Sequence, residues 1–341
     1  MKCSVISIDL AKNVFQICAL DDKRLVLLNK KVRRNDLLDQ LRQFEPTLVV
    51  TEACYTANLW GRRIQQLGHT VKFVPTHAVK PFLIGNKNDA NDALAIAEAA
   101  LRPKIHFVSV KTVEQQDLQS LYKIRELLVR QRTAQVNQLR GLLAEYGEVL
   151  PKGLRHVREE IPEILENAEN ELSHIARDFF HHLYQSIQDL SIQIDVFEQK
   201  ILQLVQGKDD YHRLLTIPGV GQRVAAAVLA FVSDIHAFKN GRQFAVWLGL
   251  TPKQISSGES NRIGRMTKRG NPTLRYLLIL GSRIVLNNCT KSDTRLNRWL
   301  RQLKERMHSC KCVVALANKL ARIIWQVLVH HEQFDHQKAC A

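Results

Sequence analysis

Apolar residues recur at steps of three and four between residues 161 and 204, and this repeat constrains the fold more than any other feature of the chain. Such spacing places apolar side chains along one side of a helix, as in a coiled coil. At 1.5 Å per residue it predicts a helical seam of roughly 65 Å, with Pro162 near its first turn and Gly207 at its end. Its members are Ile161, Leu165, Ala168, Leu172, Ile175, Phe179, Leu183, Ile187, Leu190, Ile194, Phe197, Ile201 and Leu204.

The seam requires an apolar partner, and the sequence offers two. A less regular helical pattern over residues 118–146 predicts a hairpin within the chain. The other partner is a second copy of the chain, which would make the seam a dimerisation element; the pattern alone favours neither. The long helices divide the chain into an α/β domain at residues 1–110, coiled-coil helices at 111–207 and a basic helical domain at 208–341.

The first 110 residues alternate between β-strand and helix patterns. Three strands come first, followed by alternating helices and strands, so the order is βββαβαβα. This is the order of a ribonuclease H-like (RuvC-like) domain, in which the first and fourth strands are neighbours. The expected strands cover residues 5–9, 14–20, 25–32, 47–51 and 71–74, and the expected helices 35–44, 57–67 and 93–101.

Four acids are placed to meet in such a domain. Asp9 ends the first strand, Glu52 follows the fourth, and Asp89 and Asp92 are three residues apart at the start of a helix, where they share a face. Taken alone, Asp89 and Asp92 also fit a simple helix-capping role. Four converging carboxylates repel one another unless a cation lies between them. Oxygen ligands select Mg²⁺ or Mn²⁺, and two such ions suit the cleavage of a phosphodiester.

The charge of the chain is concentrated in its last third. Residues 211–341 contain 21 Lys and Arg against 6 Asp and Glu, a net charge of +15 in a chain of +16. This imbalance predicts a polyanionic partner. No apolar run approaches the ~18 residues of a membrane span and no signal segment opens the chain, so we expect nucleic acid rather than a membrane. Seven cysteines without a CxxC pair indicate a reducing, cytoplasmic location.

Two segments of this basic third are expected to contact phosphates. The turn at residues 214–221, before an apolar helix, resembles a helix-hairpin-helix, in which Gly219 and Gly221 let backbone N–H groups approach a phosphate and Arg223 adds charge. A plain turn fits the same residues equally well. The second segment is a loop at residues 256–271 that bears Gly, Ser and four cations, Arg262, Arg265, Lys268 and Arg269.

The acidic segments resemble a known family. Residues 7–12 (SIDLAK), 51–53 (TEA) and 86–93 (NKNDANDA) are similar to the DEDD motifs of the RuvC-like domain of the IS110 insertion-sequence transposases, to which pilin-gene invertases are related. The resemblance implies that Asp9, Glu52, Asp89 and Asp92 are a catalytic, metal-binding quartet. Cys54 and Tyr55 depart from the Thr-Gly-type pair that many members have after the glutamate.

The resemblance extends to the basic loop, where a Ser-Gly step supplies a nucleophilic serine in the same family. Position matching gives this role to Ser257, with Ser256 as the nearest rival. The family relation implies a covalent phosphoserine intermediate, a homodimer that assembles into a tetramer, and DNA targets chosen with an element-encoded bridge RNA. It leaves open whether the serine and the metals that act together belong to one protomer or to two.

Two other functions are compatible with the same residues. A metal-dependent Holliday-junction nuclease would use water as its nucleophile, so Ser257 would be incidental. A non-enzymatic nucleic-acid scaffold would retain the fold without chemistry. Ser257→Ala distinguishes the nuclease, which would keep cutting, from a serine recombinase, which would lose its covalent adduct. Asp9→Asn distinguishes the scaffold, whose activity in cells would not change, from an enzyme that needs the acid.

Overall fold

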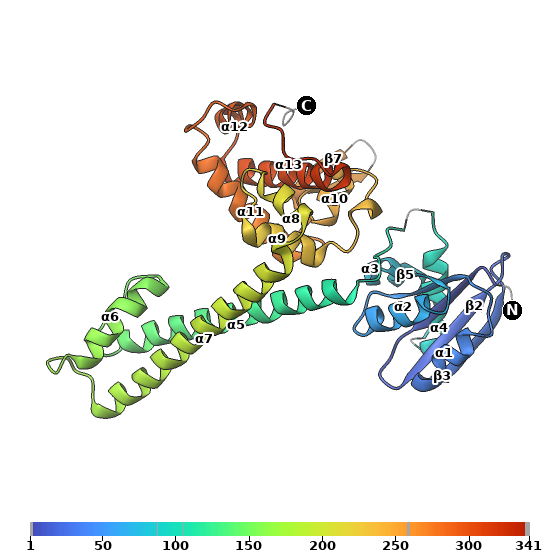
Figure 1. Cartoon of the computed structure of the whole chain (residues 1–341), viewed down its shortest axis with the longest axis horizontal. Helices are drawn as coiled ribbons and strands as arrows, with labels where there is room; N and C mark the ends of the chain where they lie inside the picture. The colour runs from blue at the N-terminus through green and yellow to red at the C-terminus, as the bar shows by residue number, and fades with distance from the viewer. Residues whose placement is uncertain (1–2, 87, 104, 258–259, 338–341) are drawn as a thin grey trace.

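The structure, a computed structural model, describes residues 3–86, 88–103, 105–257 and 260–337. Three residues of the motifs above, Lys87, Gly258 and Glu259, lie outside the described residues. Figure 1 shows an N-terminal α/β unit, an arm of long helices and a mainly helical C-terminal unit.

The N-terminal unit is built on a five-stranded mixed sheet in the order β3-β2-β1-β4-β5. β1 pairs in parallel with β4 and antiparallel with β2, so the first and fourth strands are neighbours, as in a ribonuclease H-like domain. β1 and β4 are central because their apolar side chains are covered on both faces. The strands are β1 (Val5–Asp9), β2 (Val14–Leu20), β3 (Val26–Arg33), β4 (Leu48–Glu52) and β5 (Thr70–Val74).

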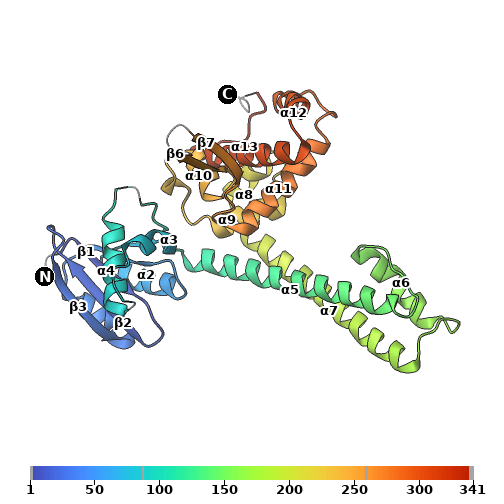
Figure 2. The same cartoon turned by 180° about the vertical axis from the view of Figure 1, so that it is seen from behind.

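Helices cover both faces of this sheet. One face packs with Ile6, Ile8 and Val49 against the first two α-helices, and the other packs with Val5 and Val50 against α4. Figure 2 shows α4 on one side of the strands and α2 on the other. The helical elements of this unit are η1 (Arg34–Asp36), α1 (Leu37–Leu41), α2 (Ala57–Gln65), α3 (Thr76–Val79), η2 (Lys80–Phe82) and α4 (Asp89–Ala100).

Three helices form the arm: α5 (Val113–Ala144), α6 (Leu154–Glu166) and α7 (His174–Gln206). The expectation of one continuous helix from 161 to 204 is wrong, because α6 ends at Glu166 and a separate helix, α7, begins at His174. The connecting residues contain their own end and start signals. Arg177 donates to the carbonyl oxygen of Leu165, and the Ser173 side chain caps α7 by accepting from the Ala176 amide.

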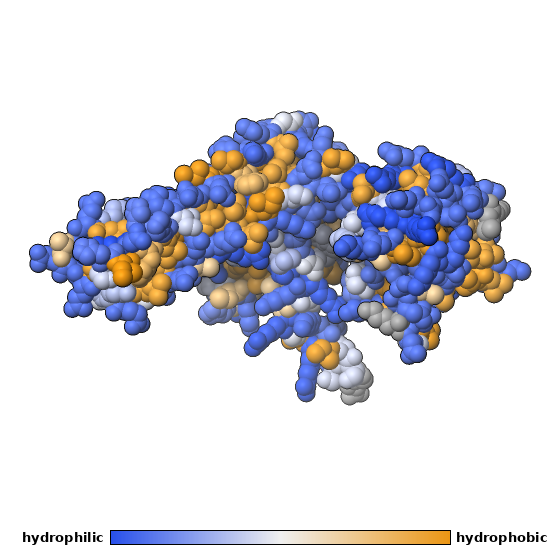
Figure 3. All heavy atoms as spheres, turned by 90° about the horizontal axis from the view of Figure 1, so that it is seen from below, coloured by the Kyte–Doolittle hydropathy of each residue, from blue (hydrophilic) through white to orange (hydrophobic). Residues whose placement is uncertain are grey.

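α5 and α7 pack together as a hairpin within the chain, which was one of the two expected partners (Figure 1). The buried stripe of α7 is shifted by one residue from the expected seam near its start. Ala176 and Phe180 are buried, whereas the predicted Ile175 is 78% exposed. Ile192, on the opposite side of α7, is 62% exposed. α7 therefore has a second apolar stripe that α5 does not cover, and Figure 3 shows apolar surface along this arm.

The C-terminal unit packs helices around a single apolar core. Much of the segment expected to be a loop, residues 256–271, instead belongs to an exposed β-hairpin: residues 256–257 end its first strand and residues 260–266 form its second. The two strands are paired from Pro252 to Met266, and residues 267–271 lie outside both strands. The elements are α8 (Asp209–Leu215), α9 (Gln222–Phe231), η3 (Ile235–Ala237), α10 (Gly241–Trp247), β6 (Pro252–Ser257), β7 (Ser260–Met266), α11 (Pro272–Asn287), α12 (Arg295–Arg306) and α13 (Ser309–His330).

α13 is long and apolar enough to span a membrane by length and composition, alone among the helices of the described residues. Leu316, Leu320 and Ile324 of this helix are completely buried in the C-terminal core. A core helix passes the same test, so α13 is weak evidence for a membrane span.

Candidate functional site

Asp9 and Glu52 lie at the same edge of the sheet. Ile8 of β1 is paired with Thr51 of β4 in parallel register, so the next residue of each strand is one of these acids. The pKa of Glu52 is raised by burial, and also by the nearby charges of Asp9 and Asp92, while Lys80 acts in the opposite direction. Three of the four expected acids therefore interact electrostatically.

Local contacts fix the start of α4 beside these strand ends. The Asn88 side chain accepts from the Asn91 amide at 2.8 Å, and this cap begins the helix at Asp89. The buried Ser7 hydroxyl of β1 donates to the Ala93 carbonyl oxygen at 2.6 Å. This bond holds the first turn of α4 against the strand that ends in Asp9, which places Asp92 near Glu52.

Asp89 has a different partner. Its carboxylate forms an ion pair with Lys31 of β3 at 3.1 Å, and the neighbouring Ala90 carbonyl accepts from the Asn29 amide at 3.2 Å. Asp89 thus lies toward the β3 side of the sheet. Lys31 and Lys80 were not identified from the sequence, because they come from a strand and a short helix that contain no motif.

The acids fit a hard divalent cation by the chemistry of their donor atoms. Within the described residues, no three His, Cys, Asp or Glu side chains already lie close enough together to hold a metal ion. Burial and the charges of Glu52 and Asp9 raise the pKa of the nearby Cys54 thiol. A bound cation would offset the repulsion at Glu52 and replace Lys31 as the partner of Asp89.

Ser257 is at the end of β6, exposed, at the tip of the hairpin. Ser257 is opposite Ser260, and Ile255 is opposite Arg262. Because paired residues and alternate residues share a face, Ser257 and Arg262 lie on the same side of the hairpin. Ser256 lies on the other side, where its hydroxyl donates to the Asn261 side chain at 3.0 Å. The two candidate serines therefore differ in their surroundings.

The base of the hairpin is tightly packed. Gly249 has φ +70°, and a Cβ there would lie 2.1 Å from the Arg269 carbonyl oxygen. The Arg275 guanidinium donates to this oxygen and to that of Leu248, both at 2.9 Å. The hairpin therefore has a rigid attachment. All four expected cations, Arg262, Arg265, Lys268 and Arg269, are exposed on it, and none has an ion pair with another described residue.

The glycines of the turn between α8 and α9 have separate roles. Gly219 has φ +81° and packs against Gly281 of α11, where a Cβ would lie 2.0 Å from the Gly219 carbonyl oxygen. Its small size therefore serves helix packing. Gly221 is exposed at the N-terminus of α9, and a Cβ there would contact nothing within 4 Å. Only Gly221 leaves room for a phosphate to approach.

Arg223, expected to contact phosphate, forms an ion pair with Glu198 of α7 at 2.8 Å. Glu198 also accepts from Nε of Arg125 on α5 at 2.9 Å. Burial tends to raise the pKa of Glu198, but its hydrogen bonds and ion pairs with these two arginines outweigh burial and lower it. The Tyr122 hydroxyl donates to the Arg223 carbonyl oxygen at 2.6 Å. We call Tyr122, Arg125, Glu198 and Arg223 the arm joint, because they connect both long helices to α9.

The acids and the hairpin stand apart in the single chain. Figures 1 and 2 show β6 and β7 in the C-terminal unit, separate from the sheet that carries the acids. The structure therefore brings Asp9, Glu52 and Asp92 together, and it leaves Ser257 in another part of the molecule.

Two family models match the chain, one in its N-terminal part and one in its C-terminal part. Residues 6–148 match the DEDD-type IS110 transposase model, and residues 211–297 match the model described as the transposase IS116/IS110/IS902 family.

Curated relatives cover nearly the whole chain. A probable family 20 transposase of Pseudomonas aeruginosa is 40% identical over 96% of this chain and 97% of its own length. The transposase for insertion sequence element IS1111A of Coxiella burnetii is 39% identical over 97% of this chain and 91% of its own length. That for IS1328 of Yersinia enterocolitica is 35% identical over 97% of this chain and 98% of its own length.

Proposed function

The chain belongs to the IS110 family of insertion-sequence transposases, enzymes that cleave and rejoin DNA, and we propose that it does so with a carboxylate-bound metal and a serine nucleophile. The observation that carries this proposal is the parallel register of β1 and β4, which places Asp9 beside Glu52, together with the Ser7–Ala93 hydrogen bond that fixes the first turn of α4 next to them. We place the enzyme in the cytoplasm, acting on DNA.

Asp9, Glu52, Asp89 and Asp92 would hold Mg²⁺ or Mn²⁺. When bound, such ions polarise a phosphoryl oxygen and stabilise the oxygens that attack and leave. The protein's own contribution is positional: the Ser7 hydroxyl fixes α4 on β1, and the sheet register sets Asp9 beside Glu52. Lys31 keeps the charge of Asp89 compensated while no ion is bound.

Ser257 is the proposed nucleophile. Its oxygen would form a bond to the phosphorus and lose its proton, while the bond to the leaving nucleotide oxygen breaks and that oxygen takes up a proton. The exposed position of Ser257 at the hairpin tip, on the same face as Arg262, supports this role. Arg262 would stabilise the charge that develops on the phosphate. Ser256 is less suited because its hydroxyl already has a partner.

The separation of Ser257 from the acids supports assembly of the active site from two copies of the chain. We propose a homodimer that forms tetramers on DNA, with one protomer's serine acting near another's metals. The second apolar stripe of α7, around Ile192, supports a dimer contact along the arm. We also propose that a bridge RNA is bound in addition to DNA, which the net charge of +16 supports.

The test is detection of a covalent protein–DNA adduct. Purified protein with Mg²⁺, its co-purifying RNA and DNA of the element ends should form an adduct that survives a denaturing gel. Ser257→Ala should abolish it and Ser256→Ala should retain it, and a chelator should prevent it in the unmodified protein. Cleavage that persists in Ser257→Ala would identify a nuclease that uses water. Asp9→Asn with unchanged transposition in cells would identify a scaffold without chemistry.

A further inference from the structure

α12 has a strongly basic outer face that the proposed chemistry does not use. The helix contains five Lys or Arg and one acid, Glu305. Leu296, Leu300 and Leu303 are buried against the C-terminal core, which is sufficient to fold an amphipathic helix. The outer face presents Arg295, Arg298 and Arg306, all exposed.

These three arginines form a line rather than a scatter. At 1.5 Å per residue they span about 16 Å along one side of the helix. Arg295 and Arg298 are three residues apart, a spacing at which two like charges destabilise a helix by a few tenths of a kcal/mol. Arg295 donates to the Gln337 carbonyl oxygen at 2.9 Å and Arg306 to that of Gln302 at 3.3 Å. Both side chains nevertheless stay exposed and outside the core packing of α12, so we expect the line of charge to have an anionic partner.

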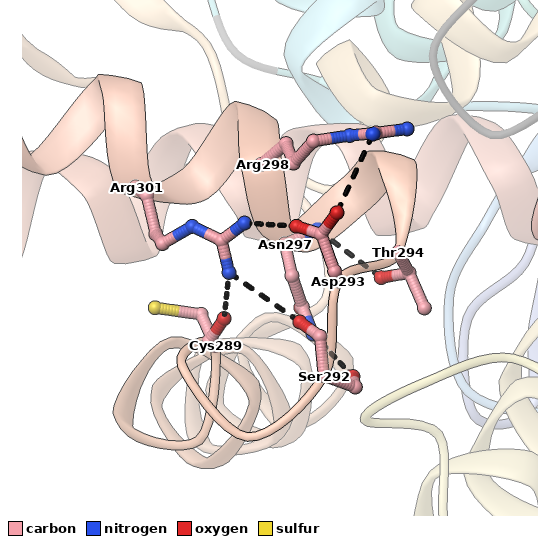
Figure 4. Close-up of polar contacts among 7 residues, drawn as sticks. All are labelled: Cys289, Ser292, Asp293, Thr294, Asn297, Arg298 and Arg301. Carbon is pink, nitrogen blue, oxygen red and sulfur yellow. Dashed lines mark hydrogen bonds and ion pairs between the residues drawn. The ribbon is translucent and has the colours of Figure 1, made fainter.

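The turn before α12 holds part of this surface in place, as Figure 4 shows. Asp293 forms ion pairs with both Arg298 and Arg301. Arg301 also donates to the carbonyl oxygens of Cys289 and Ser292, so its role is structural. Arg298 keeps most of its surface exposed, and a side chain fixed in this way loses less entropy when it binds a phosphate.

The partner is an extended one. In Figures 1 and 2, α12 and the β6–β7 hairpin lie at opposite ends of the C-terminal unit, with α13 between them. α13 contacts both of them near its middle, because the Asn318 side chain donates to the Leu250 carbonyl oxygen next to the hairpin and the Lys319 ammonium lies over the Trp299 ring of α12. A duplex that contacts both α12 and the hairpin therefore has to cross the C-terminal unit.

The chemistry of the face favours a duplex over a single strand. Single strands are bound by aromatic side chains on which bases stack. The only aromatic residue of α12, Trp299, is partly buried, and the Lys319 ammonium covers its ring at 5.0 Å from the centroid. This face therefore lacks an exposed aromatic residue for base stacking, and its arginines are of the type that contacts the phosphate backbone.

We propose that Arg295, Arg298 and Arg306 of α12 bind the phosphate backbone of duplex DNA, outside the segment of that duplex held at the β6–β7 hairpin. The second half of this statement rests on the proposed function, because it takes the hairpin as the site of cleavage. The first half does not depend on whether Ser257 is the nucleophile.

The experiment measures binding of a 30-base-pair duplex of element-end DNA to the full-length protein as a function of salt. The variant carries Arg295→Gln, Arg298→Gln and Arg306→Gln. The control carries Lys152→Gln, Arg155→Gln and Arg158→Gln, which removes the same charge from exposed positions on the arm. Each lost phosphate contact lowers the slope of log affinity against log salt by about 0.9, so three lower it by about 2.7. Between 50 and 200 mM salt, the unmodified protein should then lose about 40-fold more affinity than the variant.

The proposal would be overturned if the salt slope fell equally in the variant and the control, or if it fell in neither. It would also be overturned if the variant lost affinity only for duplex RNA of the same sequence. In the triple variant, hydroxyl-radical footprints should lose protection outside the segment protected by the hairpin and keep it within that segment. If the triple variant does not fold, Arg306→Gln alone should lower the slope by about 0.9. Failure of the Ser257 adduct with the slope change intact would contradict the proposed function and leave the α12 contact standing.

Discussion

Glu198 at the arm joint is expected to be a major stabilising residue between the long helices and the C-terminal unit. In Glu198→Gln, the amide keeps one acceptor oxygen but loses the charge and the second acceptor. The Arg125 side chain is only 17% exposed, so its charge-assisted hydrogen bonds contribute about 1.5–3 kcal/mol. The Arg223 side chain is 64% exposed and screened by water, so its pair contributes less than about 1 kcal/mol.

A chain with three structural parts does not unfold in one step, so the stability of the joint should be measured at its own residues rather than from global unfolding. Native-state hydrogen exchange at the α9 amides reports the free energy of opening this joint. Glu198→Gln should lower it by about 2–3 kcal/mol, and the exposed control Asp189→Asn on the same helix should not change it. In double-mutant cycles, the coupling of Glu198 with Arg125→Met should exceed its coupling with Arg223→Met.

The pH dependence follows from the sign of the shift. Because the two arginines lower the pKa of Glu198, its contribution is complete above the ordinary glutamate pKa and is lost as the pH falls through the lower folded value. The difference between the two proteins should therefore be full at pH 7 and shrink in acid. A coupling with Arg223 that equals or exceeds the coupling with Arg125 would refute this reasoning.

Two more outcomes follow from packing. Gly281→Ala should destabilise the C-terminal unit by about 1–3 kcal/mol in thermal or denaturant unfolding, because its Cβ would lie 2.0 Å from the Gly219 carbonyl oxygen. The control Gly207→Ala, where a Cβ contacts nothing within 4 Å, should change stability by less than about 0.5 kcal/mol. Equal effects of the two substitutions would contradict the packing argument. A variant that combines Ile192→Glu with Val196→Glu should be a monomer by light scattering and should show reduced strand transfer. The control Gln193→Glu should show neither effect. A monomeric variant with full strand transfer would exclude an active site shared between protomers.

The N-terminal unit was predictable because its strands are short apolar runs bounded by turns. The strands expected at 5–9 and 14–20 coincide with β1 and β2, and the pairing of β1 with β4 agrees with the predicted neighbours. The acids could be chosen because each comes directly after a strand or at a helix start. Their electrostatic partners could not, since Lys31 and Lys80 become neighbours of these acids only through the tertiary fold.

Elsewhere the sequence pattern was ambiguous for identifiable reasons. α7 is apolar on two sides, so the repeat could not specify which stripe is buried, and Ile175 was assigned to the wrong one. The β6–β7 hairpin is exposed on both faces, so it lacks the alternation that predicts a strand. The packing role of Gly219 depends on Gly281, a residue 62 positions further along the chain.

The length of the arm sets a demand on the stiffness of its joint. α5, with 32 residues, is about 48 Å long. The joint contacts α5 at Tyr122 and Arg125, so the helix beyond the joint, to Ala144, is about 28 Å long. A change of 10° in its direction would swing that end through about 5 Å, more than the rise of about 3.4 Å per nucleotide along one DNA strand. In the proposed dimer, where the arm makes the contact between protomers, an error of that size would shift one protomer's serine relative to the other's acids. The proposal therefore gives the cluster of Tyr122, Arg125, Glu198 and Arg223 a part in the accuracy of cutting.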